Sequence, residues 1–215
     1  MDEPSRPRFA ALSFMTLNRS VKMLEVHQMP KPRPGNHKEP LVVSQELRSI
    51  INLRGNAQDP AFVQAVQQAL GLPLPVAACS SIANAQLRMV WVGPDDWFVI
   101  GAAGEQKSIE QRLRTALSGQ HCSVTDVSSG YFMVTLAGVQ ARDVLAQGCP
   151  LDLHASVFKP DQSAGTLFFK VGIYLWQRDN TPTFEMLVRR SFIDHFWQLI
   201  NHCTLDCGWL AREAA

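Results

Sequence analysis

The chain has 215 residues, of which 46% are apolar and 18% are charged, with 20 basic residues against 19 acidic ones. This composition supports a buried core and excludes a chain that is disordered throughout. The near-balance of charge provides no overall attraction to nucleic acid or to an anionic membrane. Five scattered cysteines without a C-x-x-C pair indicate a reduced, cytoplasmic protein with free thiols. The apolar segment 9–17 is too short to span a bilayer and lacks a cleavage site, so we expect neither export nor membrane insertion.

Residues 1–40 are expected to form a Pro-rich N-terminal extension. Six prolines punctuate this stretch, and basic residues lie between Lys31 and Lys38. A short helix over 21–29 and an extended linker over 30–40 are predicted. An arm that lies on a partner and a loose tail both remain open for this segment.

A folded domain is expected over 41–210, and its first half, about 41–120, begins with a strand through Ile50 and Leu53. Asp59 followed by Pro60 predicts a helix start, because Asp accepts backbone N–H bonds and Pro suits the first helical position. Gly71 is expected to end this helix, and a loop follows. A second amphipathic helix is predicted over 109–117, closed by Gly119.

Between these helices, residues 86–101 (QLRMVWVGPDDWFVIG) predict a β-hairpin. Alternating apolar residues lead to Trp91, the turn chemistry of Gly93-Pro94-Asp95-Asp96 follows, and Trp97 opens the return strand. We expect one tryptophan near each side of the hairpin mouth.

The second half, about 121–210, repeats the order. Strands are predicted over 124–127 and 131–136, then a short helix over 139–147, a polar loop, one long strand over 166–176, a turn over 177–182 and a strand over 183–189. A last helix through Phe192 and Cys203 is expected to be capped by Ser191 and to end near Gly208.

The two halves correspond in register. A shift of 83 residues takes Leu53 to Leu136 and Trp91 to Tyr174, and a shift of 87 takes Trp97 to Phe184. Each half reads strand-helix-strand-strand-helix, with 124–127 as connector. The predicted fold class is therefore α+β, with two pseudo-repeated, ferredoxin-like halves.

A search for catalytic motifs finds no phosphate loop, nucleophile elbow or zinc signature. Asp95 and Asp96 are paired carboxylates, but neighbours in a tight turn usually act as turn formers. Arg189 and Arg190 lie at a strand-to-helix junction, where binding an anion, pairing with an acidic partner and plain solvation all remain open. Phe168, Tyr174 and Trp176 share one face of the predicted long strand, yet the balanced charge argues against RNA binding. His202 with Cys203 and Cys207 lacks a favourable metal-ligand spacing.

Several motifs, in order, resemble a known family. They are NLRGN at 52–56 followed by DPAF and ALGL, VWVGPDDWFVIG at 90–101, DVSSGYFMVTLAG at 126–138, ARDVLAQGCPLDLH at 141–154 and DNTPTFEMLVRRSF at 179–192. Together they resemble the gamma subunits of heterotetrameric sarcosine oxidases over about 41–208. Residues 1–40 lie outside the resemblance.

The resemblance implies a fold similar to the folate-binding domain of the glycine-cleavage aminomethyltransferases. It implies a complex that converts sarcosine, oxygen and tetrahydrofolate to glycine, methylene-tetrahydrofolate and hydrogen peroxide. In such complexes the alpha and beta subunits hold NAD, FAD, FMN and the folate, and the delta subunit holds zinc. The gamma subunit carries no cofactor and supplies no catalytic residues.

The leading hypothesis is therefore a non-catalytic subunit that acts in assembly and stability of the complex, with the alpha, beta and delta subunits as partners. An independent folate-binding, aminomethyltransferase-like protein is the main alternative; it requires a cavity between the two halves and an acidic residue facing the folate ring. A ferredoxin-like interaction module with an unrelated partner is a weaker one. The expected partner-contact residues are those of the hairpin mouth and of the basic pair: Trp91, Asp95, Asp96, Trp97, Arg189 and Arg190.

Overall fold

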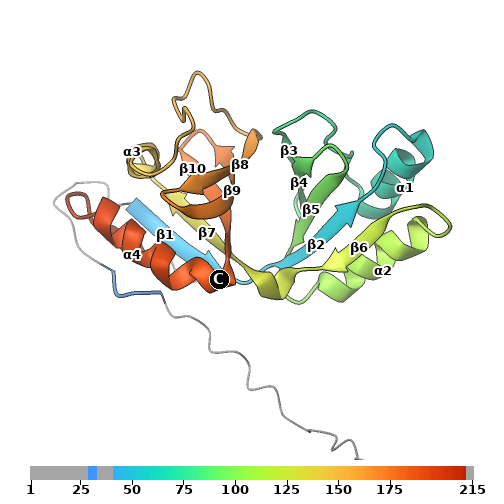
Figure 1. Cartoon of the computed structure of the whole chain (residues 1–215), viewed down its shortest axis with the longest axis horizontal. Helices are drawn as coiled ribbons and strands as arrows, with labels where there is room; N and C mark the ends of the chain where they lie inside the picture. Colours follow the sequence, from blue (N-terminus) through green and yellow to red (C-terminus); the bar gives the residue numbers. More distant parts are fainter. Residues whose placement is uncertain (1–28, 33–40, 212–215) are drawn as a thin grey trace, which may run out of the picture.

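The computed structural model describes residues 29–32 and 41–211. The predictions for the N-terminal extension fall almost entirely outside the described residues. Met29 is partly buried against the core of the second half. The described chain has two β-sheets, each with two α-helices on its outer side. Figure 1 shows the two halves side by side, each made of one sheet and its helices. The predicted α+β class is confirmed.

The first sheet has the order β3-β4-β5-β2-β6, and every neighbouring pair in it is antiparallel. Its elements are β2 (Ser49–Arg54), α1 (Pro60–Leu70), β3 (Ser81–Ala83), β4 (Arg88–Gly93), β5 (Asp96–Gly101), α2 (Gln106–Ala116) and β6 (Ser123–Asp126). The order β6-β2-β5-β4 with two crossover helices is compatible with the expected ferredoxin-like unit, to which β3 adds an edge.

The second sheet has the order β11-β1-β7-β10-β9-β8, in which only β1 and β11 run parallel. Its elements are β1 (Leu41–Glu46), η1 (Ser128–Gly130), β7 (Tyr131–Ala137), α3 (Ala141–Ala146), β8 (Ser163–Phe168), β9 (Val171–Asp179), β10 (Thr183–Arg189), η2 (Arg190–Phe192), α4 (Ile193–Cys203) and β11 (Trp209–Ala211).

The halves exchange one strand each. β1 opens the first half in sequence but pairs with β7 of the second sheet, and β6 leads into β7 but pairs with β2 of the first sheet. The chain therefore crosses between the sheets at residues 47–48 and again at 127–130. Sheet membership differs here from the division into 41–120 and 121–210, because β1 and β6 fill corresponding places in opposite sheets. The segment expected as a connector is thus a full member of the first sheet.

The start and end signals of α1 are confirmed. The Asp59 side chain accepts the N–H of Ala61, Pro60 opens the helix, and Gly71 ends it in the left-handed conformation with a φ of 68°. Gly55 sits against this helix, where a Cβ would lie 2.3 Å from the Phe62 ring. The close approach of β2 to α1 therefore requires glycine.

Two predictions for the second half are wrong. The strand expected over 166–176 is two strands, β8 and β9, joined by a turn at Phe169 and Lys170, with Phe169 at a φ of 52°. No Gly, Pro, Asn or Asp marks that turn, so the apolar run looks continuous. Because the chain reverses there, Phe168 lies on the helix side, whereas Tyr174 and Trp176 face the other sheet.

The predicted cap of the last helix is also wrong. Ser191 lies within η2, the N-cap position of α4 is Phe192, and no side chain caps that end. β1, β3 and β11 were not predicted as strands.

Three apolar clusters hold the fold together. One lies between the first sheet and α1 and α2, a second between the second sheet and its helices, and a third between the two sheets. The third contains Ile50, Phe98, Tyr131, Trp176 and Leu187. Because strand residues alternate between faces, each sheet buries one face under its helices and the other against its counterpart.

Candidate functional site

The hairpin of β4 and β5 forms as predicted. Trp91 pairs across the strands with Trp97, and Gly93 pairs with Asp96. Trp97 is fully buried, and its indole N–H donates to the Pro75 carbonyl oxygen at 2.8 Å. Trp91 is half-buried against the same cluster. Both tryptophans therefore close the core beneath α1 and α2, and Trp97 offers no surface to a partner.

The two neighbouring acids of this hairpin share Arg54 as an ion-pair partner, at 2.7 Å for Asp95 and 4.0 Å for Asp96, but they border different pockets. The Asp95 carboxylate, in the exposed turn, accepts a hydrogen bond from Arg54 Nη2 at 2.7 Å. Asp96 begins β5 and accepts from Asn52 Nδ2 at 2.5 Å. The hydrogen bond and charge of Asp95, with a contribution from Asp96, raise the pKa of Arg54. The acids thus do not form a catalytic pair.

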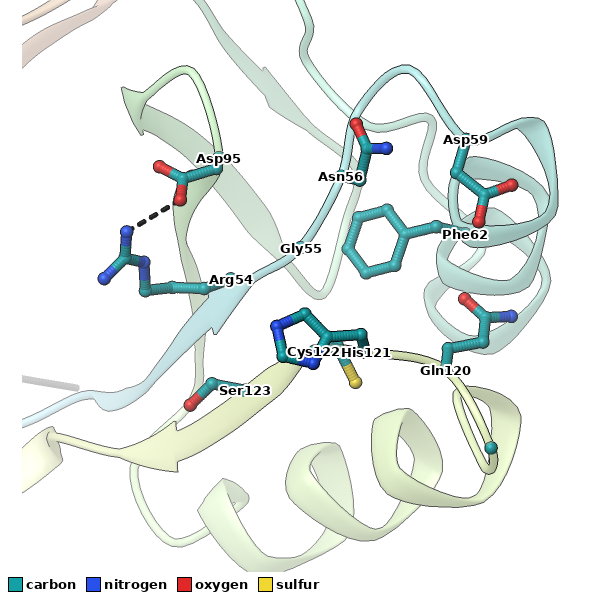
Figure 2. Close-up of a pocket in the computed structure, with 11 residues that line it drawn as sticks. Arg54, Gly55, Asn56, Asp59, Phe62, Asp95, Gln120, His121, Cys122 and Ser123 are labelled. Atoms are coloured by element: carbon teal, nitrogen blue, oxygen red, sulfur yellow. Dashed lines mark hydrogen bonds and ion pairs between the residues drawn. The ribbon is translucent and has the colours of Figure 1, made fainter.

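Asp95 borders an open cleft of about 910 Å³ between the β2–α1 turn and the α2–β6 turn (Figure 2). The Phe62 ring lies at its inner end, and the Arg54–Asp95 ion pair stands at one side. His121 and Cys122 also line the cleft. Among the described residues, neither makes a side-chain hydrogen bond to a carboxylate or to the other, so the cleft holds no base–nucleophile pair.

Asp96 lines a second pocket, of about 490 Å³, between the two sheets. The first sheet contributes Asn52, Asp96, Phe98 and Asp126, the second contributes Tyr131, Tyr174 and Arg189, and the crossing segment contributes Ser129. The pocket brings together two residues singled out from the sequence, Asp96 and Arg189.

Three aromatic rings form the floor of this pocket. The Phe98 ring lies edge-on to Tyr174, with centroids 5.0 Å apart, and to Tyr131 at 5.6 Å. The Arg189 guanidinium sits 5.2 Å from the centre of the Tyr131 ring. Burial raises the pKa of Tyr131, the charge of Arg189 opposes this, and Tyr174 and Asp96 add to the rise. The Tyr131 hydroxyl therefore stays neutral.

Arg189 and Arg190, although adjacent in sequence, lie on opposite faces of the second sheet. Arg189 lines the pocket between the sheets, whereas Arg190 lies 5.3 Å from the ring of Phe132, which belongs to the helix-side cluster. They therefore do not form a joint anion site. Over residues 29–32 and 41–211, no group of three or more His, Cys, Asp or Glu side chains is placed to hold a metal ion.

Sequence reasoning missed Asn52 and Tyr131 as site residues, and it considered Tyr174 only as part of an RNA-binding face. Asn52 is a polar residue inside an otherwise apolar strand, which is a usable signal. Tyr131 on β7 and Tyr174 on β9 belong to the same sheet, and they meet Phe98 only because the two sheets pack face to face. No local pattern contains that information. In the described part of the chain, no helix is long and apolar enough to cross a membrane.

Comparison with known proteins identifies a family and a fold. Residues 54–206 match the model of the "Sarcosine oxidase, gamma subunit family". The sarcosine oxidase subunit gamma of Corynebacterium sp. (strain U-96) is 31% identical over 133 residues, which cover 61% of this chain and 63% of that protein. The matched part therefore spans less than two thirds of that relative.

Two solved structures show the same fold. The heterotetrameric sarcosine oxidase from Corynebacterium sp. U-96, in complex with pyrrole 2-carboxylate, contains a chain that superposes with a TM-score of 0.71 at 24% identity, covering 81% of this chain and 88% of that one. The glycine cleavage system aminomethyltransferase T from Bartonella henselae superposes with a TM-score of 0.59 at 14% identity, covering 80% of this chain and 47% of that one.

Proposed function

Because this chain belongs to the sarcosine oxidase gamma subunit family, we propose that it is the gamma subunit of a heterotetrameric sarcosine oxidase and acts in assembly and stability of that complex. The observation that carries the proposal is the family match over residues 54–206. It confirms the resemblance deduced from the hairpin and C-terminal motifs. The proposed folded body of the subunit is residues 41–210.

The geometry supports a non-catalytic role. The two paired acids border separate pockets and both pair with Arg54, and the two adjacent arginines lie on opposite faces of the second sheet. General acid–base or nucleophilic catalysis needs such groups to converge on one substrate position. The chain contributes no cofactor site under this proposal. FAD, FMN, NAD, tetrahydrofolate and zinc reside on the alpha, beta and delta partner subunits, which carry out the oxidation of sarcosine to glycine.

Co-expression tests this proposal. A tagged form of this chain is produced with candidate alpha, beta and delta subunits from the same organism, and the mixture is separated by size exclusion. We expect the chain to elute with the other subunits in one high-mass peak. Elution at the position of a free monomer, beside intact partner subunits, would overturn the proposal. Omission of this chain should lower the yield or thermal stability of the remaining complex.

Folate binding is a second candidate, and the pocket between the sheets favours it. The alternative deduced from sequence required a cavity between the halves and an acidic residue facing it, and Asp96 lines such a cavity. The three aromatic rings offer stacking surfaces for a flat heterocycle.

Isothermal titration of the chain with tetrahydrofolate, under reducing conditions, tests this candidate. Binding in the micromolar range that is lost in Asp96→Asn, but retained in Asp95→Asn, would support it. Absence of heat at high micromolar folate would overturn it. Trp91 and Trp97 are poor fluorescence reporters here because both pack on the helix side of the first sheet.

A further inference from the structure

One edge of the second sheet is only partly used. At its start, β8 is joined to the first half: the Ser163 N–H donates to the Cys79 carbonyl oxygen at 2.8 Å, and Ser80 forms an isolated antiparallel bridge with Gln162. Beyond Ser163 the sheet order ends at β8, and no further strand of residues 41–211 pairs with its outer side.

The register shows which backbone groups face this open edge. β8 and β9 close through the pair Phe168–Val171, around a two-residue turn. In an antiparallel ladder, residues that bond to the partner strand alternate with residues whose N–H and C=O point away. Ser163 points away, as its bond to Cys79 demonstrates. Gly165 and Leu167, two and four residues further on, therefore present their N–H and C=O groups to the same open edge.

An apolar hollow of about 290 Å³ adjoins this edge. It exists because two residues on that face of the sheet, Gly165 and Gly172, have no side chains. A Cβ at Gly172 would meet nothing within 4 Å. Tyr174 and Phe192 form walls of the hollow. Phe192 is 45% exposed and Leu167 47%, so apolar surface surrounds the hollow without a covering segment in the described chain.

Arg189 supplies the charge at this hollow. Its side chain lines the hollow as well as the pocket between the sheets, and its guanidinium is held over the Tyr131 ring. Arg189 is exposed and makes no ion pair with any other described residue. An arginine that is held in place beside apolar surface, without an ion pair to another described residue, is complementary to a carboxylate on a segment that also carries an apolar side chain.

We propose that the edge of β8 from Gly165 to Leu167 receives an extended segment of another subunit by strand addition, with an apolar side chain in the hollow and an acidic side chain on Arg189. Backbone hydrogen bonds to the edge would supply affinity, and the hollow and the arginine would select the sequence. The inference rests on the proposed function, because it assigns the docking surface of that same subunit.

A competition experiment tests the surface inside the assembled complex. Wild-type and variant chains are co-expressed in equal amounts with the partner subunits, and their ratio in the purified complex is measured by mass spectrometry. Gly172→Trp fills the hollow, and Gly172→Ala is its matched control because it leaves most of the space free. Arg189→Glu reverses the charge, and Lys107→Glu makes the same change on the exposed side of α2.

We expect Gly172→Trp and Arg189→Glu each to be incorporated roughly tenfold less than wild type, the scale of an interface hot spot. Both controls should be incorporated equally with wild type. Circular dichroism of the free variants verifies folding. If either main variant does not fold, a photo-crosslinking residue at Leu167 replaces it; an adduct with another subunit supports the proposal, with position 107 as the negative control.

Equal incorporation of the folded variants, or the absence of an adduct at Leu167 in an intact complex, would overturn this assignment. The outcome is separate from failure of the proposed function, in which wild-type chain itself is absent from the complex.

Discussion

The two halves fasten their hairpins to the rest of the fold with different chemistry at corresponding positions. In the first half, Trp97 donates its indole N–H to the carbonyl of Pro75, in the loop that follows α1. In the second half the corresponding residue is Phe184, which has no donor. Its ring instead stacks on Phe158 at 6.3 Å and lies 5.1 Å from the Arg142 guanidinium.

Arg142 supplies the hydrogen-bond donors that the Phe184 side chain lacks. Its guanidinium donates to the carbonyl oxygens of Leu153 and Phe158 and to the side-chain oxygen of Gln177, at 2.9 Å for the last. The two halves therefore anchor their loops differently. The first uses one indole N–H, that of Trp97, and the second uses the Arg142 guanidinium, which donates to several oxygen atoms. The two halves thus share an aromatic residue at the corresponding position, but only the first half has a hydrogen-bond donor there.

The hairpin turns differ in the same way. Asp95 makes one exposed ion pair, with Arg54. Asp179, at the second turn, accepts bonds from the Thr181 hydroxyl at 2.6 Å and from the Thr181 and Thr183 N–H groups at 3.0 Å. The second turn is thus organised by its carboxylate, whereas the first is fixed by Gly93-Pro94 and strand pairing.

The largest expected effect is at the first-half anchor. Trp97→Ala removes a fully buried side chain and should lower the free energy of unfolding by about 3–5 kcal/mol. Trp97→Phe keeps an aromatic ring in the core but loses the hydrogen bond to the Pro75 carbonyl, and this lost bond should cost about 1 kcal/mol. Urea unfolding measures both. Equal losses for the two variants would show that the hydrogen bond, rather than the packing, dominates this anchor.

The second-half anchor should be weaker. Arg142→Met keeps the apolar stem and removes every donor to the loop, and we expect a loss of about 2 kcal/mol in unfolding free energy. Arg142→Lys should recover only part of this loss, because a single ammonium cannot reproduce the planar fork. Full stability of the methionine variant would contradict the anchoring role of the guanidinium.

The two turns should respond differently to acid. Burial alone would raise the pKa of Asp179, but hydrogen bonds from Thr181, Thr183 and Arg178 outweigh it and lower the pKa from 3.8 to about 2. The carboxylate therefore stabilises the fold above the unfolded pKa of about 4, and this contribution is lost as pH falls from about 4 through 2.

Asp179→Asn should be less stable than wild type at neutral pH, and the difference should shrink as pH approaches 2. Urea titrations at several pH values measure it. A difference that is constant with pH would show that the turn does not depend on the charge of Asp179.

The smallest effect is expected at the first turn. Asp95→Ala should leave the melting temperature unchanged, because both partners of its ion pair are more than half exposed, at 52% for Arg54 and 57% for Asp95. A loss comparable with that of Asp179→Asn would mean that both turns rely on their carboxylates, and the contrast between them would disappear.

Local signals made part of this fold predictable. Asp59, Pro60 and Gly71 act within a few residues of one another, so the bounds of α1 follow from sequence alone. The β8–β9 turn was missed because Phe169 adopts a positive φ without a residue type that favours it. The place of β1 was missed because its partner, β7, is remote in sequence and is reached only after the strand exchange.

The candidate site was predictable only in its components. Asp96 and Arg189 were singled out from sequence, and the structure brings them to one pocket. Their separation from Asp95 and Arg190 follows from the alternation of strand residues and from the turn geometry. The contribution of Tyr131 and Tyr174 depends on packing between two sheets, which no single segment encodes.

Native mass spectrometry of the complex, purified through a tag on another subunit, is the sharpest test of whether this chain is a subunit of a heterotetrameric sarcosine oxidase. We expect an assembly of four different chains with one copy of this chain, which dissociates as an intact folded subunit on activation. An assembly that carries sarcosine oxidase activity and full stability without this chain, with the chain found only free or bound to itself, would contradict it.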